Sequence, residues 1–187
     1  MTDATRLTPL GVMVLALLRE DPMHPYEMIR LMRQRHDDRI IALTNGTVYH
    51  TVARLERLGL VSEVGVDREG NRPERTTYAL TDAGDAAITD WVRRELPRLG
   101  RPTEYRVALA EAHNLGREET LALLRRRLAA LEEALHVYRT GLAKARGGTV
   151  FEQYLVEADR EFALLTADRA WLAAFLDRLA HPDFRSE

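Results

Sequence analysis

Apolar residues in the second half of the chain recur at alternating steps of three and four, which is the spacing of heptad repeats in coiled coils. One series runs from residue 121 to 145 and another from 151 to 179, with Gly147 and Gly148 between them. Each series is longer than three heptads, so each predicts a helix about 40 Å long at 1.5 Å per residue. Two such helices joined by a glycine turn predict an antiparallel helical hairpin.

Helices of that length extend beyond a small globular domain, so their apolar positions predict contact with a second subunit. We expect two chains to pair through residues 103–180. The candidate dimerisation residues are Leu121, Leu124, Leu128, Leu131, Leu135, Tyr138, Leu142, Phe151, Leu155, Phe162, Leu165, Leu172 and Leu176.

The first hundred residues combine helical and strand-like patterns. The expected elements are helices at about 9–20, 25–35 and 44–58, strands at 60–66 and 75–80, and a helix from 81 to about 96. Pro97–Pro102, which includes Gly100, marks a change to a purely helical pattern. We therefore expect a mainly α-helical chain with a small β-hairpin, formed by an N-terminal domain at 1–98 and a helical dimerisation domain at 99–187.

Three helices followed by a hairpin are the winged helix-turn-helix arrangement, in which the third helix enters the major groove and the hairpin contacts the backbone or the minor groove. Within the helix expected at 44–58, Val48, Val52 and Leu55 share one face. His50 and Arg54 point roughly the opposite way. The pattern predicts a helix that docks by one side and presents a polar edge by the other.

Several side chains of this region have the chemistry to bind duplex DNA. Arg54 can donate two hydrogen bonds to guanine, Asn45 can pair with adenine, and Thr47 can contact a base edge or a phosphate. His50 points at the groove, and the Tyr49 hydroxyl can reach a phosphate. The hairpin adds three arginines to the candidate DNA-binding residues, namely Arg68, Arg72 and Arg75.

Three alternatives stand beside these assignments. Arg57 and Arg54 can be solvent-facing partners of Glu56 and of Asp37 or Asp38. Tyr49 can instead be a half-buried packing residue. The hairpin arginines alternate with Asp67, Glu69 and Glu74, which is also the pattern of an ordinary solvated loop.

The composition disfavours catalysis, metal binding and secretion. The chain has no cysteine, and its six histidines show neither HxxxH nor HxxEH spacing. No phosphate-binding glycine loop or Gly-x-Ser-x-Gly motif is present, so we expect no catalytic residues, no cofactor and no metal. The N-terminus lacks the features of a signal peptide, and the apolar run from Leu10 to Leu18 is too short for a membrane span, so we expect a cytoplasmic protein.

Several segments in the range 8–84 resemble the PadR family of transcriptional regulators, and they stand in the order found in that family. The segments are Thr8-Pro9-Leu10-Gly11, His24-Pro25-Tyr26-Glu27-Met28, Gly46-Thr47-Val48-Tyr49, Arg54-Leu55-Glu56-Arg57-Leu58-Gly59-Leu60-Val61 and Tyr78-Ala79-Leu80-Thr81-Asp82-Ala83-Gly84. The helical remainder resembles the longer C-terminal domain of the subgroup that includes virulence regulators.

The resemblance implies a homodimer built by the C-terminal helices, which represses nearby genes. Because a dimer would place two recognition helices on one side, about 34 Å apart, we expect it to bind an inverted-repeat operator. It also implies that a small aromatic or drug-like molecule lowers DNA affinity. By position, Tyr26 and Tyr49 match tyrosines that face the DNA backbone in the family. Two residues depart from the pattern: Pro25 stands where glycine is frequent, and His50 where proline or another small residue is frequent.

Three rival interpretations remain open at the level of sequence. The protein can act chiefly as a small-molecule sensor, with Trp91 and Trp171 in a candidate effector pocket. It can be a winged-helix module that binds another protein, because residues 1–99 hold 14 arginines against 15 acidic residues and are not basic overall. An enzyme is the third interpretation, and no constellation of residues supports it.

Overall fold

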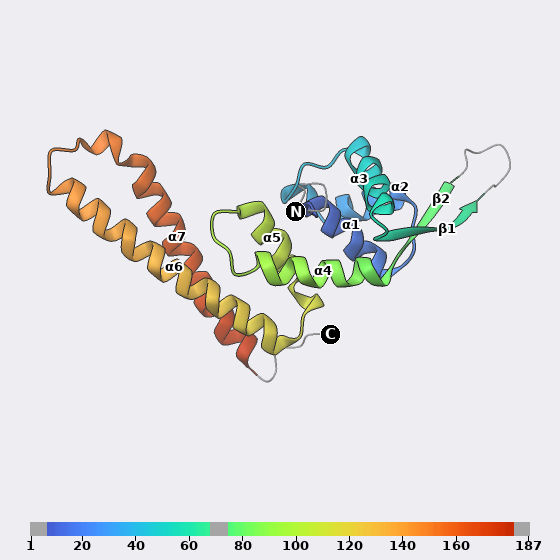
Figure 1. Ribbon diagram of the computed structural model, residues 1–187. Coiled ribbons are helices and arrows are strands. Elements are labelled where there is room, and N and C mark those ends of the chain that lie inside the picture. Colours follow the sequence, from blue (N-terminus) through green and yellow to red (C-terminus); the bar gives the residue numbers. More distant parts are fainter. Residues whose placement is uncertain (1–6, 68–74, 182–187) are drawn as a thin grey trace. The chain divides into compact units, whose positions relative to one another are not determined.

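The computed structural model describes residues 7–67 and 75–181, and the chain divides into two compact units. The first unit comprises residues 1–95 and 101–114, and the second comprises residues 96–100 and 115–187 (Figure 1). Residues 101–114 thus belong to the first unit, although the boundary expected from the sequence lay between residues 98 and 99.

The first unit begins with three helices whose starts follow from local capping. These helices are α1 (Pro9–Glu20), α2 (Pro25–Gln34) and α3 (Asn45–Arg57). The Thr8 hydroxyl accepts a hydrogen bond from the Gly11 N–H at 3.1 Å, and His24 Nδ1 accepts one from the Tyr26 N–H at 3.0 Å. In α1 and α2, proline follows the cap at the first helical position, where its missing N–H removes no intrahelical bond.

An antiparallel hairpin follows α3, formed by β1 (Val61–Asp67) and β2 (Arg75–Leu80). Val61 pairs with Leu80 at its base, and the register shifts between Glu63 and Gly65. The backbones of Met23 and Tyr78 exchange hydrogen bonds of 3.0 and 3.2 Å. The base of the hairpin is therefore attached to the loop between α1 and α2.

Helices α4 (Asp82–Glu95) and α5 (Pro102–Ala110) complete the first unit, with the short 3₁₀ helices η2 (Asp37–Arg39) and η3 (Glu111–Asn114). α4 and α5 pack against each other and against α1. The core of this unit is formed by buried apolar side chains of α1 to α4, among them Val12, Val14, Leu15, Met28, Met32, Val48, Ile88, Trp91 and Val92.

The second unit is a helical hairpin of α6 (Arg117–Arg146) and α7 (Val156–Ala180), with η4 (Glu152–Tyr154) in the connection. The two long helices lie side by side in opposite directions (Figure 1). At the connection, Arg146 forms ion pairs with Glu152 at 2.9 Å and Asp159 at 2.7 Å. At the other end, the Arg117 Nε–H donates to the Leu179 carbonyl at 2.9 Å. The helical hairpin predicted from the heptads is therefore confirmed.

The candidate dimerisation residues mostly line the contact between α6 and α7 of the same chain. Phe151 is exposed, and Leu121, Leu128, Tyr138, Phe162 and Leu165 are half-buried. The remaining seven are buried, namely Leu124, Leu131, Leu135, Leu142, Leu155, Leu172 and Leu176. Much of the heptad pattern thus serves a contact within one chain.

The prediction of a mainly helical fold with a small β-hairpin is confirmed. The observed helices and strands begin and end close to the residues expected from the periodicity. None of the helices in the described part of the chain combines the length and apolarity that crossing a membrane requires.

Gly84 provides a test of how the hairpin joins α4. A Cβ at this position would lie 2.2 Å from the Leu60 carbonyl oxygen and 2.7 Å from Leu80 Cδ1. We expect Gly84→Ala to lower the free energy of unfolding by about 1–3 kcal/mol, because a rigid backbone atom must move. Urea denaturation followed by circular dichroism measures the change.

Gly46→Ala is the matched control, since nothing lies within 4 Å of a Cβ at Gly46 on α3. This substitution should be neutral or should stabilise by up to about 1 kcal/mol, because alanine favours the helix. Equal effects of the two substitutions would contradict the close approach at Gly84.

Candidate nucleic-acid interface

Helix α3 has one buried face and one exposed face. Val48, Val52 and Leu55 are buried, and α3 packs against α1 and α2. His50 is exposed on the opposite side, and Tyr49 is exposed on the flank between the two sides. This arrangement follows because a helix turns by 100° per residue. The docked helix therefore presents a continuous polar surface to solvent.

The first turn of α3 is held by a reciprocal cap between two threonines. The Thr44 hydroxyl accepts a hydrogen bond from the Thr47 N–H at 3.2 Å, and the Thr47 hydroxyl accepts one from the Thr44 N–H at 3.1 Å. The Thr47 hydroxyl also donates to the Thr44 carbonyl at 2.8 Å. Thr47, expected to contact DNA, thus also has a structural role at the helix start.

Asn45 lies at the first position of α3 and contacts α2. Its Oδ1 accepts a hydrogen bond from Arg33 Nη2 at 3.1 Å. Arg33 is not among the residues predicted from the sequence to bind DNA. A signal was present, because Arg30 and Arg33 are three residues apart on α2 and therefore share a face, and both are exposed.

Two exposed tyrosines lie near the start of α2 and on α3. Tyr26 is 58% exposed and Tyr49 is 44% exposed. The rings of His24 and Tyr49 meet edge to face, with centroids 6.1 Å apart and an angle of 74°. This contact orients the Tyr49 ring while much of its surface stays accessible, so the residue combines packing with exposure.

The remaining candidate DNA-binding residues are four arginines of α3 and the hairpin, two of which lie within the described residues. Arg54 is half-buried on the flank of α3. Arg75 is the first residue of β2 and pairs with Asp67 in the hairpin register. Arg68 and Arg72 lie outside the described residues, so their role stays a prediction.

Exposed cations gather on the helices that carry this surface. They are the arginines at positions 30 and 33 on α2, 39 on η2 and 57 on α3. Phosphate contacts need a basic face rather than a basic protein. The near-neutral charge of the first hundred residues is therefore compatible with a local cationic surface.

The two tryptophans of the candidate effector pocket lie in different units. Trp91 is only 2% exposed, and its indole N–H donates to the Leu7 carbonyl at 3.2 Å. It lines a cavity of about 260 Å³ with residues that include Leu58 and Leu60. Trp171, on α7, is 43% exposed and stacks on Phe175 with ring centroids 5.2 Å apart.

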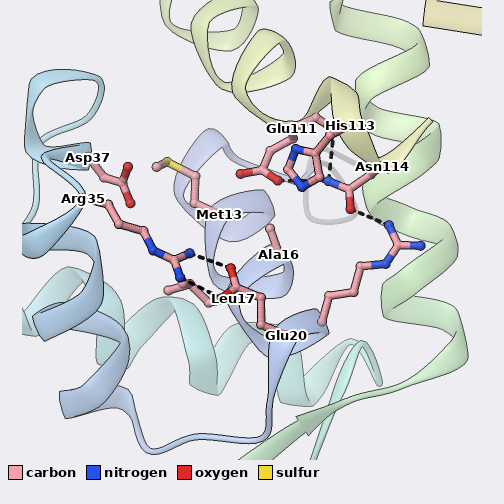
Figure 2. A pocket seen from close by; sticks show the side chains of 10 residues that line it. Met13, Ala16, Leu17, Glu20, Arg35, Asp37, Glu111, His113 and Asn114 are labelled. Atoms are coloured by element: carbon pink, nitrogen blue, oxygen red, sulfur yellow. Dashed lines mark hydrogen bonds and ion pairs between the residues drawn. The ribbon is translucent and has the colours of Figure 1, made fainter. Parts of the chain in front are cut away.

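A cavity that the sequence analysis did not anticipate lies in the first unit between α1, η2 and η3. Its volume is about 300 Å³, and Met13, Ala16 and Leu17 line it from α1. Figure 2 shows Asp37 and Glu111 on either side of Met13. These lining residues are distant in the sequence, so no local pattern could reveal the cavity.

Burial and hydrogen-bond partners shift the pKa values of the carboxyl groups around this cavity in different directions. Arg35 donates to both Glu20 carboxylate oxygens at 2.5 and 2.7 Å, and these hydrogen bonds lower the pKa of Glu20 (Figure 2). Burial raises the pKa of Glu111, although His113 and a 3.0 Å hydrogen bond from Asn114 Nδ2 act in the opposite direction. Burial likewise raises the pKa of Asp37.

The described residues offer no preformed metal centre. Among them, no group of three or more histidine, aspartate or glutamate side chains could hold a metal ion. The first unit instead combines an exposed polar helix, a preceding helix pair and an adjoining β-hairpin. This arrangement defines a winged helix-turn-helix protein, a class that includes DNA-binding transcriptional regulators.

Residues 14–90 match the model of the transcriptional regulator PadR-like family. This segment includes α2, α3 and the β-hairpin described above. The family that this segment matches consists of DNA-binding transcriptional regulators and not of enzymes. No curated protein matches the chain.

Solved structures of PadR proteins are similar to the chain at low identity. PadR of Bacillus subtilis in complex with operator DNA is 18% identical, with a TM-score of 0.44, over 92% of this chain and 99% of that chain. The same protein in complex with p-coumaric acid is 17% identical, with a TM-score of 0.42, over 93% and 100%. A PadR family regulator from Clostridium difficile is 20% identical, with a TM-score of 0.38, over 44% and 82%.

The raised pKa of Glu111 predicts how stability depends on pH. A carboxyl whose pKa is higher in the folded than in the unfolded state makes a contribution to stability that is fully present below the unfolded pKa and is lost as pH rises through the folded pKa. We therefore expect Glu111→Gln to be more stable than the parent at pH 7. The difference should shrink as the pH falls into the ordinary carboxyl range. Thermal unfolding between pH 4 and 8 measures it.

Glu63→Gln is the control, because Glu63 is exposed on β1 of the same unit. It reports the background effect of removing one negative charge from the first unit. A Glu111→Gln variant that is less stable than the parent at pH 7 would contradict the role assigned to burial.

Proposed function

We propose that the protein is a homodimer that represses transcription by binding an inverted-repeat operator, with one α3 in each of two successive major grooves. The observation that carries this proposal is α3 itself, which is docked by its apolar face and exposes His50 opposite that face and Tyr49 beside it. The major groove of B-DNA is wide enough to admit one helix. Two such helices on one side of a dimer would meet grooves about 34 Å apart.

The exposed side chains divide into base readers and backbone contacts. We assign His50 and Asn45 to base edges, because both are exposed and lie in the N-terminal half of α3, the part of a recognition helix that meets base edges. Arg54 is a further base reader, reaching the groove from the flank of the helix. Tyr26 and Tyr49 would donate their hydroxyls to phosphates, which positions the protein without specifying the sequence. The hairpin arginines would add backbone or minor-groove contacts.

The dimer interface would use the apolar residues that α6 and α7 leave exposed. Leu164 and Trp171 are exposed on α7 and are seven residues apart, so they share a face of that helix. Phe175, which stacks on Trp171, extends the same face by one turn. Because most heptad leucines already pack inside the chain, a second chain would contact this outer face.

Release by a small aromatic or drug-like molecule is the remaining part of the proposal, as is membership of the subgroup with a long C-terminal domain. A structure of the Bacillus subtilis PadR protein contains p-coumaric acid. In this chain, the cavities beside Trp91 and between α1, η2 and η3 are the candidate places for such a molecule.

A binding assay of the full chain against its own upstream DNA tests the proposal. Specific retention over random duplex, with an affinity that falls steeply with salt, is expected because phosphate contacts release counterions. Arg54→Ala should lower the binding free energy by about 1–3 kcal/mol at the specific site and by little on random duplex.

The same assay tests release by a small molecule, because added phenolic acids or planar drugs should reduce retention of the specific duplex.

Arg57→Ala is the matched variant, one turn later on α3, and should affect all duplexes alike. Equal losses on specific and random duplex for Arg54→Ala would make Arg54 a phosphate contact. No retention of any duplex, at low as well as at high salt, would favour a winged helix that binds another protein.

Dimerisation has its own test on α7. The double substitution Leu164→Glu with Trp171→Glu should produce monomers with unchanged helix content, because both side chains are exposed within one chain. Sedimentation velocity and circular dichroism measure the two properties. Leu172→Glu is the contrasting variant, since Leu172 is buried in the α6–α7 contact and its replacement should unfold that unit. A double variant that stays dimeric would exclude this face.

A further inference from the structure

His24 connects the start of α2 with α3 through two contacts of one imidazole ring. It is the N-cap residue of α2, and its Nδ1 accepts a hydrogen bond from the Tyr26 N–H at 3.0 Å. The same ring meets the ring of Tyr49 on α3 edge to face, with centroids 6.1 Å apart and an angle of 74°. His24 is half-buried, whereas Tyr26 and Tyr49 are exposed. One side chain therefore contacts both of the residues whose hydroxyls are proposed to reach the DNA backbone.

The cap determines the protonation of the imidazole. A backbone N–H can only donate, so the Nδ1 that accepts from it must carry a lone pair. The ring that caps α2 is consequently neutral, with its proton on Nε2. Replacing His24 removes no positive charge from the surface, so an effect of the substitution on DNA binding must come from the contacts of the ring.

The first turn of α2 has no backbone donor left for a phosphate, although helix N-termini commonly bind phosphate through such groups. Pro25 has no N–H, and the Tyr26 N–H donates to His24 Nδ1. The N–H groups of Glu27 and Met28 both donate to the His24 carbonyl, at 2.8 and 3.2 Å. Phosphate contacts at this end of α2 must then be made by side chains, among which the tyrosine hydroxyls are suitable donors.

The contact with His24 restricts the Tyr49 ring before DNA arrives. An exposed side chain samples several rotamers, and ordering it on binding costs conformational entropy. Edge-to-face aromatic pairs at this separation attract each other beyond the effect of the area that they bury. Preorganisation of this kind raises affinity because less freedom is lost when the complex forms.

We infer that His24 is a positioning residue for the DNA backbone contact, and that its ring holds Tyr49 in the orientation in which the hydroxyl donates to a phosphate. This role requires the ring of His24 and not its capping hydrogen bond. Phosphates are present in every sequence, so the role affects affinity for all duplexes alike and leaves the base preference unchanged. The inference rests on the proposed insertion of α3 into the major groove.

Two substitutions of His24 in the full chain separate the ring from the cap. His24→Asn keeps a side-chain acceptor suited to a helix N-cap and removes the ring. It should lower affinity by about 2- to 10-fold, on random duplex as well as on the upstream DNA, and change the melting temperature little. His24→Phe keeps a ring and removes the acceptor, so it should retain affinity and lower the melting temperature by about 2–8 °C. Fluorescence anisotropy of labelled duplexes and thermal unfolding measure the two properties.

Tyr49→Phe tests the coupling, because it removes the hydroxyl and keeps the ring. This variant should also lose about 2- to 10-fold in affinity on every duplex. In the Tyr49→Phe background, His24→Asn should cause no further loss, since a double-mutant cycle isolates the interaction between the two residues.

His36→Asn is the matched control. It makes the same exchange at an exposed histidine of the first unit, where the φ of 61° is one that asparagine also adopts. This substitution should leave the affinity for duplex DNA unchanged.

Several results would overturn the inference. Additive losses from His24→Asn and Tyr49→Phe would make His24 a direct phosphate contact through its Nε2–H. No loss from either substitution, or equal losses from His24→Asn and His24→Phe, would exclude the ring contact as the cause. Failure of the proposed function is recognised separately, because the parent itself would then bind no duplex at any salt concentration.

Discussion

The burial of Val48, Val52 and Leu55 is the constraint on which the proposed DNA-binding surface depends. This apolar face fixes the rotation of α3 about its own axis, and it thereby decides which side chains reach solvent. Tyr49 and His50 are exposed because they stand opposite or beside that face. Apolar burial contributes roughly 25 cal/mol per Å² and has no directional preference. The orientation of α3 is therefore set by the helical spacing of these three residues.

Backbone and threonine hydrogen bonds connect the hairpin to the helices. Met23 and Tyr78 pair through their backbones, and the Thr81 hydroxyl donates to the Gly59 carbonyl at 2.8 Å while it accepts from the Gly84 N–H. The close approach of Gly84 to Leu60 lets α4 start directly beside this junction. The base of the wing is therefore held by the same unit that docks α3.

Local patterns in the sequence predicted the helices and strands well, whereas contacts between residues far apart in the chain could not be predicted from it. The apolar periodicity of α3 is a signal within a few residues, and the structure confirms the helix that it predicted. The Arg33–Asn45 bond and the cavity between α1, η2 and η3 join residues far apart in the chain. The DNA-binding assignments, the domain boundary and the dimer interface stay predictions.

The heptad leucines separate what the sequence determined by itself from what the tertiary structure decided. Their spacing determined that residues after about 117 form two long helices with apolar stripes, because side chains at steps of three and four lie on one side of a helix. Whether such a stripe packs against the same chain or another is not encoded in the spacing, since any apolar stripe can cover it. The turn after Gly147 and Gly148 brings α7 back onto α6, and this intramolecular contact buries Leu131 and Leu172 within one chain.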